Sequence, residues 1–169
     1  MQESKPIRSL DPNEMVETFI EGARLASVDF GTNEVRPETL SAPHRRPTAL
    51  PPDTQVVYAF LVGSVCLKVG KAGRKTQARF TSQHYSVNAA PSTLAKSIIN
   101  NKSRLLDVLP GLYRSGVEVV NEASIGSWLE TNASRFHIFI PSASGQFPLC
   151  LLEGFVQCRL LPIFEGKNP

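Results

Sequence analysis

The first apolar pattern along the chain is that of an amphipathic helix. The run Asp11-Pro12-Asn13-Glu14 is typical of a helix start, with Asp11 as the N-cap, Pro12 at the first helical position and Glu14 closing a capping box. Five apolar residues then recur at helical spacing: Met15, Phe19, Ile20, Ala23 and Ala26. They predict one amphipathic helix that ends near Ser27.

The next segment breaks this periodicity. Five prolines fall between Arg36 and Asp53: Pro37, Pro43, Pro47, Pro51 and Pro52. Such a density of proline predicts an extended linker. The chain is therefore expected to comprise a helical N-terminal extension (1–35), a proline-rich linker (36–53) and one globular domain (54–169).

The globular part opens with a β-hairpin pattern. Val56–Val62 is rich in β-formers, Gly63-Ser64 predicts a turn, and Val65–Val69 predicts the second strand. Helical patterns follow at 74–83, 91–99, 103–109 and from Asn121 through Leu129; a third strand is expected at 136–140, and a last helix from Pro148 to just before Pro162. The expected fold is α/β, a small three-stranded antiparallel or mixed sheet flanked by helices, with an N-terminal helix extension.

Composition narrows the class of protein. The 169 residues suffice for one compact domain with an extension. No apolar run approaches the roughly 20 residues that span a bilayer, and the first fifteen residues lack the apolar stretch of a secretory signal. We therefore expect no membrane partner and a cytoplasmic location. The three cysteines form no CxxC pair and the three histidines are scattered, which favours neither a disulfide framework nor a zinc site.

Positive charge is concentrated in one block. The net charge is only +3, yet residues 56–115 hold nine lysines and arginines and a single acidic residue, Asp107. Such a block suits a polyanion, because each neutralised phosphate releases counterions. A solvated cationic surface is the alternative. A nucleotide-binding P-loop is not expected, since Val69 and Arg74 stand where GxxxxGK[ST] requires glycines before Lys75-Thr76.

Four short motifs point to more specific chemistry. Val56-Val57-Tyr58 lies on the first hairpin strand and Lys68-Val69-Gly70 on the second; Arg79 falls on the following helix, and Glu153 lies among apolar residues of the last helix. In this order, over about residues 54–166, the chain resembles the GIY-YIG nuclease family. The first tyrosine and the glycine of the family's motifs are kept, whereas Lys68 replaces the second tyrosine.

The chain departs from the family pattern in two further places. His84 follows Arg79 by five residues, whereas the family often shows four. Glu165 stands where the family often has asparagine after the proline of the last helix.

The resemblance implies a Mg²⁺-dependent endonuclease, with DNA as the expected substrate. Tyr58 would deprotonate or orient the attacking water, and Lys68 would lower the pKa of that phenol from its usual value near 10. Arg79 would grip the scissile phosphate. Glu153 would hold one Mg²⁺, and His84 or Tyr85 would contact the phosphate or donate to the leaving group.

Further substrate contacts are expected from the basic loop that precedes Arg79. Its cations are Lys71, Arg74 and Lys75. Each candidate also has a structural interpretation: Tyr58 as a packed strand residue, Arg79 as a surface cation, and Glu153 as a surface residue beside Gln157 on the same helix. Two other functions are open: a nucleic-acid-binding module without turnover, and an adaptor that docks a partner through the N-terminal helix.

The hairpin register provides a structural test. A strict two-residue loop pairs Val62 with Val65 and places Tyr58 and Lys68 on opposite faces of the sheet, because strand faces alternate with period two. Shared chemistry needs both side chains on one face, hence a three-residue connection that pairs Val62 with Cys66, or a β-bulge. We predict the bulge.

Overall fold

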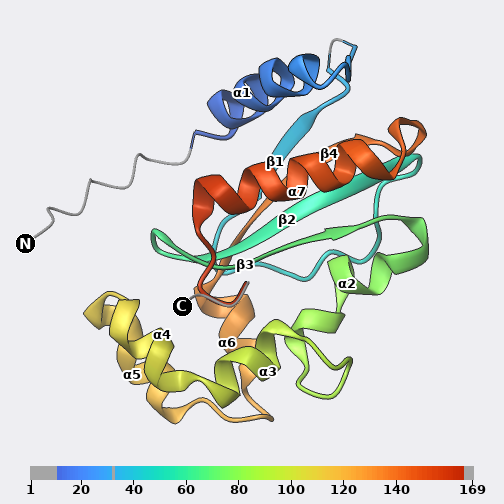
Figure 1. The fold of residues 1–169 in the computed structure, drawn as a ribbon. Coiled ribbons are helices and arrows are strands. Elements are labelled where there is room, and N and C mark those ends of the chain that lie inside the picture. Colours follow the sequence, from blue (N-terminus) through green and yellow to red (C-terminus); the bar gives the residue numbers. More distant parts are fainter. Residues whose placement is uncertain (1–10, 32, 166–169) are drawn as a thin grey trace, which may run out of the picture.

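Four strands form one sheet at the centre of the molecule (Figure 1). The computed structural model describes residues 11–31 and 33–165. Its strands are β1 (Arg36–Leu40), β2 (Thr54–Val62), β3 (Val65–Ala72) and β4 (Ser134–Pro141), in the spatial order β1-β4-β2-β3. Neighbouring strands pair antiparallel throughout. The predicted α/β class is confirmed.

The expected number of strands is wrong, since the sheet has four and not three. The additional strand is β1, which falls inside the segment predicted to be a linker. It pairs with β4 along its whole length, from Arg36 opposite Phe139 to Leu40 opposite Arg135. Pro37 is compatible with this strand because β1 lies at the edge of the sheet. An edge strand has a neighbour on one side only, so it tolerates a proline, which lacks the backbone N–H.

The described part of the chain contains seven α-helices. They are α1 (Pro12–Leu25), α2 (Gln77–Thr81), α3 (Leu94–Asn100), α4 (Lys102–Val108), α5 (Gly111–Val119), α6 (Ile125–Asn132) and α7 (Gln146–Leu160). Three 3₁₀ turns are also present: η1 (Arg74–Thr76), η2 (Gln83–Tyr85) and η3 (Ser142–Ser144). Within these residues no helix is long and apolar enough to cross a membrane.

Most predicted helices are present, with some altered boundaries. Asp11 caps α1 as expected, accepting hydrogen bonds from the backbone N–H groups of Asn13 and Glu14. The predicted helix at 74–83 is instead η1, a short α2 and the start of η2. The last helix begins at Gln146, two residues before the proline that was expected to open it. Helix α5 was not predicted.

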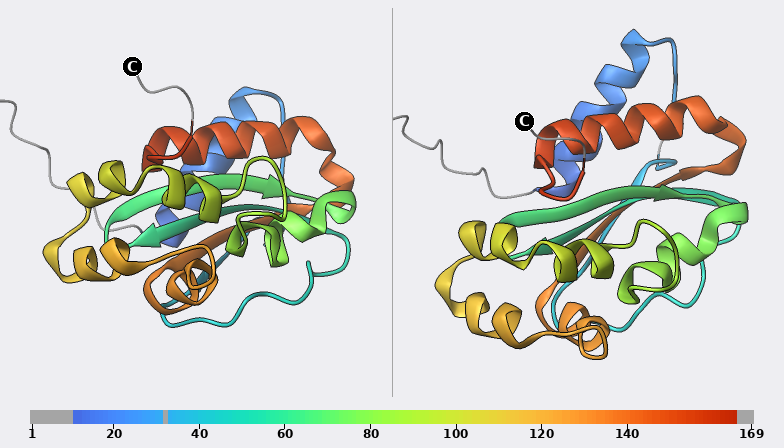
Figure 2. Two further views of the ribbon diagram at one scale, coloured as in Figure 1. Left: turned by 90° about the horizontal axis from the view of Figure 1, so that it is seen from below. Right: turned by 60° about the horizontal axis from the view of Figure 1, so that its bottom comes forward.

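The helices lie in two layers. Helices α1 and α7 cover one face of the sheet, and α2 to α6 lie on the other (Figure 2). The apolar side of α1 is buried against the sheet and α7; the rings of Phe19 and Phe155, for example, have centroids 5.8 Å apart. The face of α1 that an adaptor would present to a partner is thus used within the chain itself.

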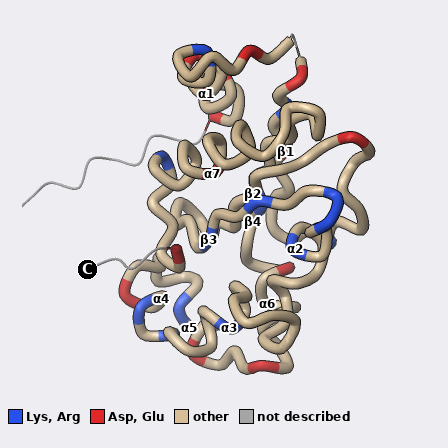
Figure 3. The backbone as a smooth tube through the Cα atoms, turned by 45° about the vertical axis from the view of Figure 1, so that its right-hand side comes forward, with Lys and Arg blue, Asp and Glu red and all other residues tan. Residues whose placement is uncertain are grey.

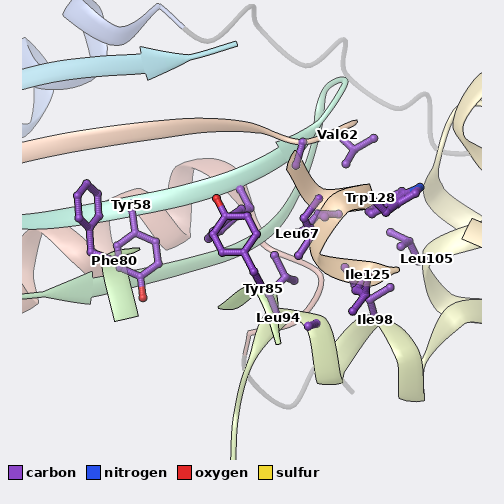
Figure 4. Close-up of a cluster of buried hydrophobic side chains, with 14 of the residues drawn as sticks. Tyr58, Val62, Leu67, Phe80, Tyr85, Leu94, Ile98, Leu105, Ile125 and Trp128 are labelled. Atoms are coloured by element: carbon purple, nitrogen blue, oxygen red, sulfur yellow. The ribbon is translucent and has the colours of Figure 1, made fainter. Parts of the chain in front are cut away.

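The second face carries the larger apolar cluster (Figure 4). Tyr58 of β2 packs against Phe80 of α2, and the far end of the cluster is filled by side chains of α3 to α6, including Trp128. Tyr58 is only 1% exposed, so its ring belongs to the core and only its hydroxyl end reaches polar groups. This cluster anchors the segments that carry Arg79 and His84.

A β-bulge sets the relation between β2 and β3. The tight turn pairs Val62 with Val65, but the register shifts after Leu61–Cys66, so that Phe60 lies opposite Lys68 and Tyr58 opposite Gly70. The extra residue is Leu67. The predicted bulge is confirmed, and it brings the side chains of Tyr58 and Lys68 to the same face of the sheet.

Candidate active site

A cavity of about 350 Å³ opens at the outer edge of β3. All five residues that the sequence nominated as catalytic line it: Tyr58, Lys68, Arg79, His84 and Glu153. Lys71, nominated as a substrate contact, lines it as well. These side chains come from β2, β3, α2, η2 and α7, so the cavity extends from the α2 side of the sheet around β3 to the α7 side.

Tyr58 and His84 are joined by a hydrogen bond of 2.7 Å between the hydroxyl and Nε2. The other ring nitrogen of His84, Nδ1, accepts from the backbone N–H of Leu94. Burial lowers the pKa of His84 to about 3, with Lys68 and Arg135 adding to the effect. The neutral ring therefore carries its proton on Nε2 and donates it to the oxygen of Tyr58. The hydroxyl proton of Tyr58 is then free to point elsewhere.

Burial also governs the protonation of Tyr58. It raises the pKa of the phenol above its ordinary value of 10, although Arg135 and Arg79 act in the opposite direction. The expectation that Lys68 would lower this pKa is wrong in this arrangement, since desolvation outweighs the nearby cations and Lys68 is paired with Glu165. Tyr58 is suited to orienting a water molecule or phosphate by hydrogen bonding rather than to removing a proton at neutral pH.

Gly70 allows Tyr58 to lie where it does. A Cβ atom added at Gly70 would lie 2.7 Å from the Tyr58 hydroxyl oxygen and 2.8 Å from its ring carbon Cζ. No side chain larger than hydrogen therefore fits between the two strands without moving the phenol. A glycine at this position is therefore what lets the Tyr58 hydroxyl reach His84.

We expect Gly70→Ala to displace Tyr58 and break its bond to His84. The free energy of unfolding should fall by about 1–3 kcal/mol, as is typical of overpacking. Urea unfolding measures this loss, and NMR of the His84 ring reports the broken bond. Gly22→Ala is the control, because a Cβ there meets nothing within 4 Å and alanine favours the helix. An unchanged His84 signal in Gly70→Ala would contradict the expected displacement.

Two ion pairs hold the carboxylates of the cavity. Glu153 Oε2 lies 2.6 Å from Lys71 Nζ, and Glu165 Oε1 lies 2.6 Å from Lys68 Nζ. The hydrogen bond to Glu153 raises the pKa of Lys71, with partial burial opposing it. Glu153 thus has a partner on β3, in contrast to the structural interpretation that placed it beside Gln157.

Arg79 is the cation of the cavity that keeps its charge available. Its side chain is exposed, and no ion-pair partner is found for it among residues 11–31 and 33–165. Lysine and arginine residues also lie along β3 and along the segment that leads into α2 (Figure 3). An anion that enters the cavity therefore meets an uncompensated guanidinium.

Within the described part of the chain, the carboxylates of the cavity do not form a metal cage. In the described ranges no group of three or more His, Cys, Asp or Glu side chains is close enough to hold a metal. The cavity does contain two carboxylates, Glu153 and Glu165. Mg²⁺ commonly takes one or two carboxylates and completes its shell with water and substrate phosphates, so a site with a single carboxylate such as Glu153 is compatible with this ion. A cation at Oε2 of Glu153 would have to displace the Lys71 ammonium.

The remaining predicted contacts lie outside the cavity. Arg74 and Lys75 are exposed on η1 and do not line it. Tyr85 is only 3% exposed, and its hydroxyl is bonded to His44 Nε2 and to Arg135 Nη1. The expectation that Tyr85 touches the substrate or leaving group is therefore not supported, because burial and internal hydrogen bonds already use its polar end.

Arg135 supports the site without lining the cavity, and the sequence did not reveal it. It is fully buried, donates to the Phe80 carbonyl (2.8 Å) and to the Tyr85 hydroxyl (3.1 Å), and packs against the ring of Phe60 (4.7 Å). These bonds tie α2 and η2, which carry Arg79 and His84, to the sheet. Arg135 directly precedes the predicted third strand, and no local signal in the sequence marks it as buried.

Comparisons with known proteins return no relative for this chain. No protein-family model, no curated protein and no solved structure matches it. The functional assignment therefore depends on the residues and on their geometry.

Proposed function

We propose that this protein is a metal-dependent endonuclease that hydrolyses phosphodiester bonds in nucleic acid, with DNA as the substrate. The observation that carries the proposal is the convergence of the five nominated side chains on one open cavity. They come from five separate elements and from positions up to 95 residues apart, from Tyr58 to Glu153. The choice of DNA follows the resemblance to GIY-YIG nucleases.

The cavity offers the parts that such a reaction needs. The guanidinium of Arg79 matches the oxygens of a phosphodiester and offsets charge that develops in the transition state. The free proton of Tyr58 is available to orient an attacking water molecule or a phosphate oxygen. Glu153 would hold the metal ion, whose chemistry when bound is to stabilise charge on the departing oxygen.

A binding module without turnover is the second candidate. Its support is the contact of 2.6 Å between Lys71 and Glu153, which satisfies the carboxylate without a metal. The cavity would then hold a backbone phosphate through its cations and leave it intact. The adaptor alternative has less support, because the apolar face of α1 is buried.

A plasmid-nicking assay separates these candidates. We expect the wild type to nick supercoiled plasmid in Mg²⁺ but not in EDTA. Arg79→Met should reduce the rate by about 10²-fold or more, the usual effect of removing one transition-state donor. Arg74→Met is the matched control, an exposed arginine of η1 outside the cavity, and should stay within about threefold of wild type. Binding without nicking by the wild type would favour the binding module.

A further inference from the structure

The chain turns back toward the active site after α7. Leu161 ends the helix in the left-handed conformation (φ 47°). The backbone N–H groups of Ile163 and Phe164 then donate to the carbonyls of Cys66 and Leu67, each at 3.0 Å. These carbonyls belong to the bulged part of β3, so the irregularity that orients Lys68 also binds the C-terminal segment. Glu165 follows directly and lines the cavity.

Glu165 satisfies a nearly buried cation. The side chain of Lys68 is only 10% exposed, and its ammonium is 2.6 Å from Glu165 Oε1. An ammonium removed from water needs an anion beside it, and in the described chain Glu165 is the ion-pair partner of Lys68. This position within the cavity is therefore built to hold a negatively charged oxygen.

The two carboxylates of the cavity are held differently. Glu153 lies inside α7, where the helix fixes its backbone. Glu165 lies five residues beyond the end of that helix, and its side chain is 26% exposed. Displacing the Glu165 side chain requires loss of its ion pair with Lys68. Glu153, by contrast, is tied to β3 by its contact with Lys71.

We propose that Lys68 binds a phosphate of the ligand in a dedicated subsite. Glu165 is the internal anion that occupies this subsite until the phosphate replaces it. The inference rests on the proposed function, since it takes a nucleic-acid phosphate as the natural occupant. With Glu165 in place, the lining carries Lys68, Lys71 and Arg79 against two carboxylates; with Glu165 displaced, it carries the same cations against one. The open form therefore attracts a polyanion more strongly.

The need to displace Glu165 should weaken the binding of phosphate and nucleic acid by the wild type. A ligand that needs the open form has its apparent affinity reduced by the fraction of protein in that form. Removing the charge of Glu165 should remove this penalty, provided that Lys68 is present to receive the phosphate. The effect is thus expected to depend on Lys68.

Phosphate binding without metal tests the proposal. Inorganic phosphate and a fluorescent 12-base-pair DNA duplex are titrated in EDTA into wild type, Glu165→Gln, Lys68→Met and the double variant. We expect Glu165→Gln to bind both probes about fivefold more tightly, the low end of typical site coupling. Lys68→Met should bind more weakly, and Glu165→Gln should give no gain in that background. Glu122→Gln, an exposed carboxylate outside the cavity, controls for net charge and should change affinity less than twofold.

Three results would overturn the proposal. The first is unchanged or weaker binding by a Glu165→Gln protein whose thermal unfolding is normal. The others are an equal gain in affinity for Glu122→Gln, and a gain in affinity for Glu165→Gln that persists when Lys68 is replaced. Weaker Mg²⁺ binding by Glu165→Gln, with unchanged phosphate affinity, would instead make Glu165 a metal ligand and also overturn it. Because these titrations need no cleavage, they are independent of the plasmid assay. Tighter binding by Glu165→Gln without plasmid nicking by the wild type would support the subsite and contradict the proposed nuclease. Nicking without tighter binding would support the nuclease and contradict the subsite.

Discussion

Replacing Glu153 by glutamine is expected to reduce Mg²⁺-dependent nicking by about 10³-fold, since metal charge stabilisation supplies several kcal/mol of the barrier reduction. Glutamine has nearly the same shape, and its amide oxygen can still accept from Lys71, the present partner at 2.6 Å. What it lacks is the negative charge that a divalent cation requires. The loss should therefore appear in the metal-dependent rate and not in the fold.

The control for Glu153→Gln is Glu130→Gln. Glu130 is also a partly exposed carboxylate in an ion pair, with Arg46, but it lies outside the cavity. Both substitutions should change the free energy of unfolding by no more than about 1 kcal/mol, as is usual for pairs near the surface. Only Glu153→Gln should abolish nicking and raise the Mg²⁺ concentration needed for residual activity. Wild-type nicking by Glu153→Gln would show that Glu153 does not hold the metal.

The hairpin was the most predictable part of the site. The runs of β-forming residues on either side of Gly63-Ser64 predicted the two strands, and the requirement that Tyr58 and Lys68 share a face demanded an irregularity in register. The sequence did not indicate which residue would bulge. That role falls to Leu67, whose side chain is fully buried in the apolar cluster between the sheet and α3 to α6.

Strand β1 and helix α5 were missed because tertiary packing overrides their local preferences. Pro37 makes β1 look like linker, yet an edge position beside β4 accepts it. Helix α5 contains Gly116, a poor helix former. A Cβ added at Gly116 would lie 2.9 Å from Trp128 Nε1, so glycine there permits close contact between α5 and α6. Neither neighbour can be identified from the local sequence.

Two polar residues that support or line the cavity, Arg135 and Glu165, were not nominated from the sequence for a related reason. Arg135 lies at a strand boundary and Glu165 follows the last helix, positions where charged side chains are usually exposed. Only the assembled sheet shows Arg135 beneath α2 and Glu165 beside Lys68. The family resemblance nominated Tyr58, Arg79 and Glu153. It marked Glu165 only as a departure from the pattern, and Arg135 carries no signal apart from its contacts across the fold.

The protein is expected to lose stability steeply as the pH falls below about 6. His84 and His137 are both buried, and burial lowers the pKa of His84 to about 3 and that of His137 to about 2. His137 lies between aromatic rings, with the Phe80 ring centroid 4.9 Å away. Within the described residues neither of its ring nitrogens has a hydrogen-bond partner. Protonating His84 in place would leave a charge in the core. Protonating His137 would do the same, with the half-exposed Glu38 carboxylate, 4.0 Å from its Nδ1, as the nearby anion.

The direction of the effect follows from which state binds protons more tightly. In the unfolded chain both histidines titrate near pH 6.5, so below that pH the unfolded state holds more protons than the folded state. Their stabilising contribution is complete above pH 6.5 and is lost as the pH falls toward the folded-state pKa values of about 3 and about 2. Each contributes a slope of about 1.4 kcal/mol per pH unit. Together they should remove about 5 kcal/mol between pH 6 and pH 4, a large share of the stability of an ordinary domain.

Urea unfolding at pH 7.5, 6, 5 and 4 measures this slope, and His137→Phe separates the contribution of one ring. Phenylalanine does not titrate and suits the surroundings of Phe80 and Phe139. The variant should therefore lose only about half as much stability as wild type between pH 6 and pH 4, with little change at pH 7.5. Equal slopes for the two proteins would mean that His137 is not held neutral by burial. Arg135 is buried near the His137 ring and also lowers the pKa of His137. A shallow dependence of stability on pH in the wild type would therefore mean that water reaches the core around Arg135.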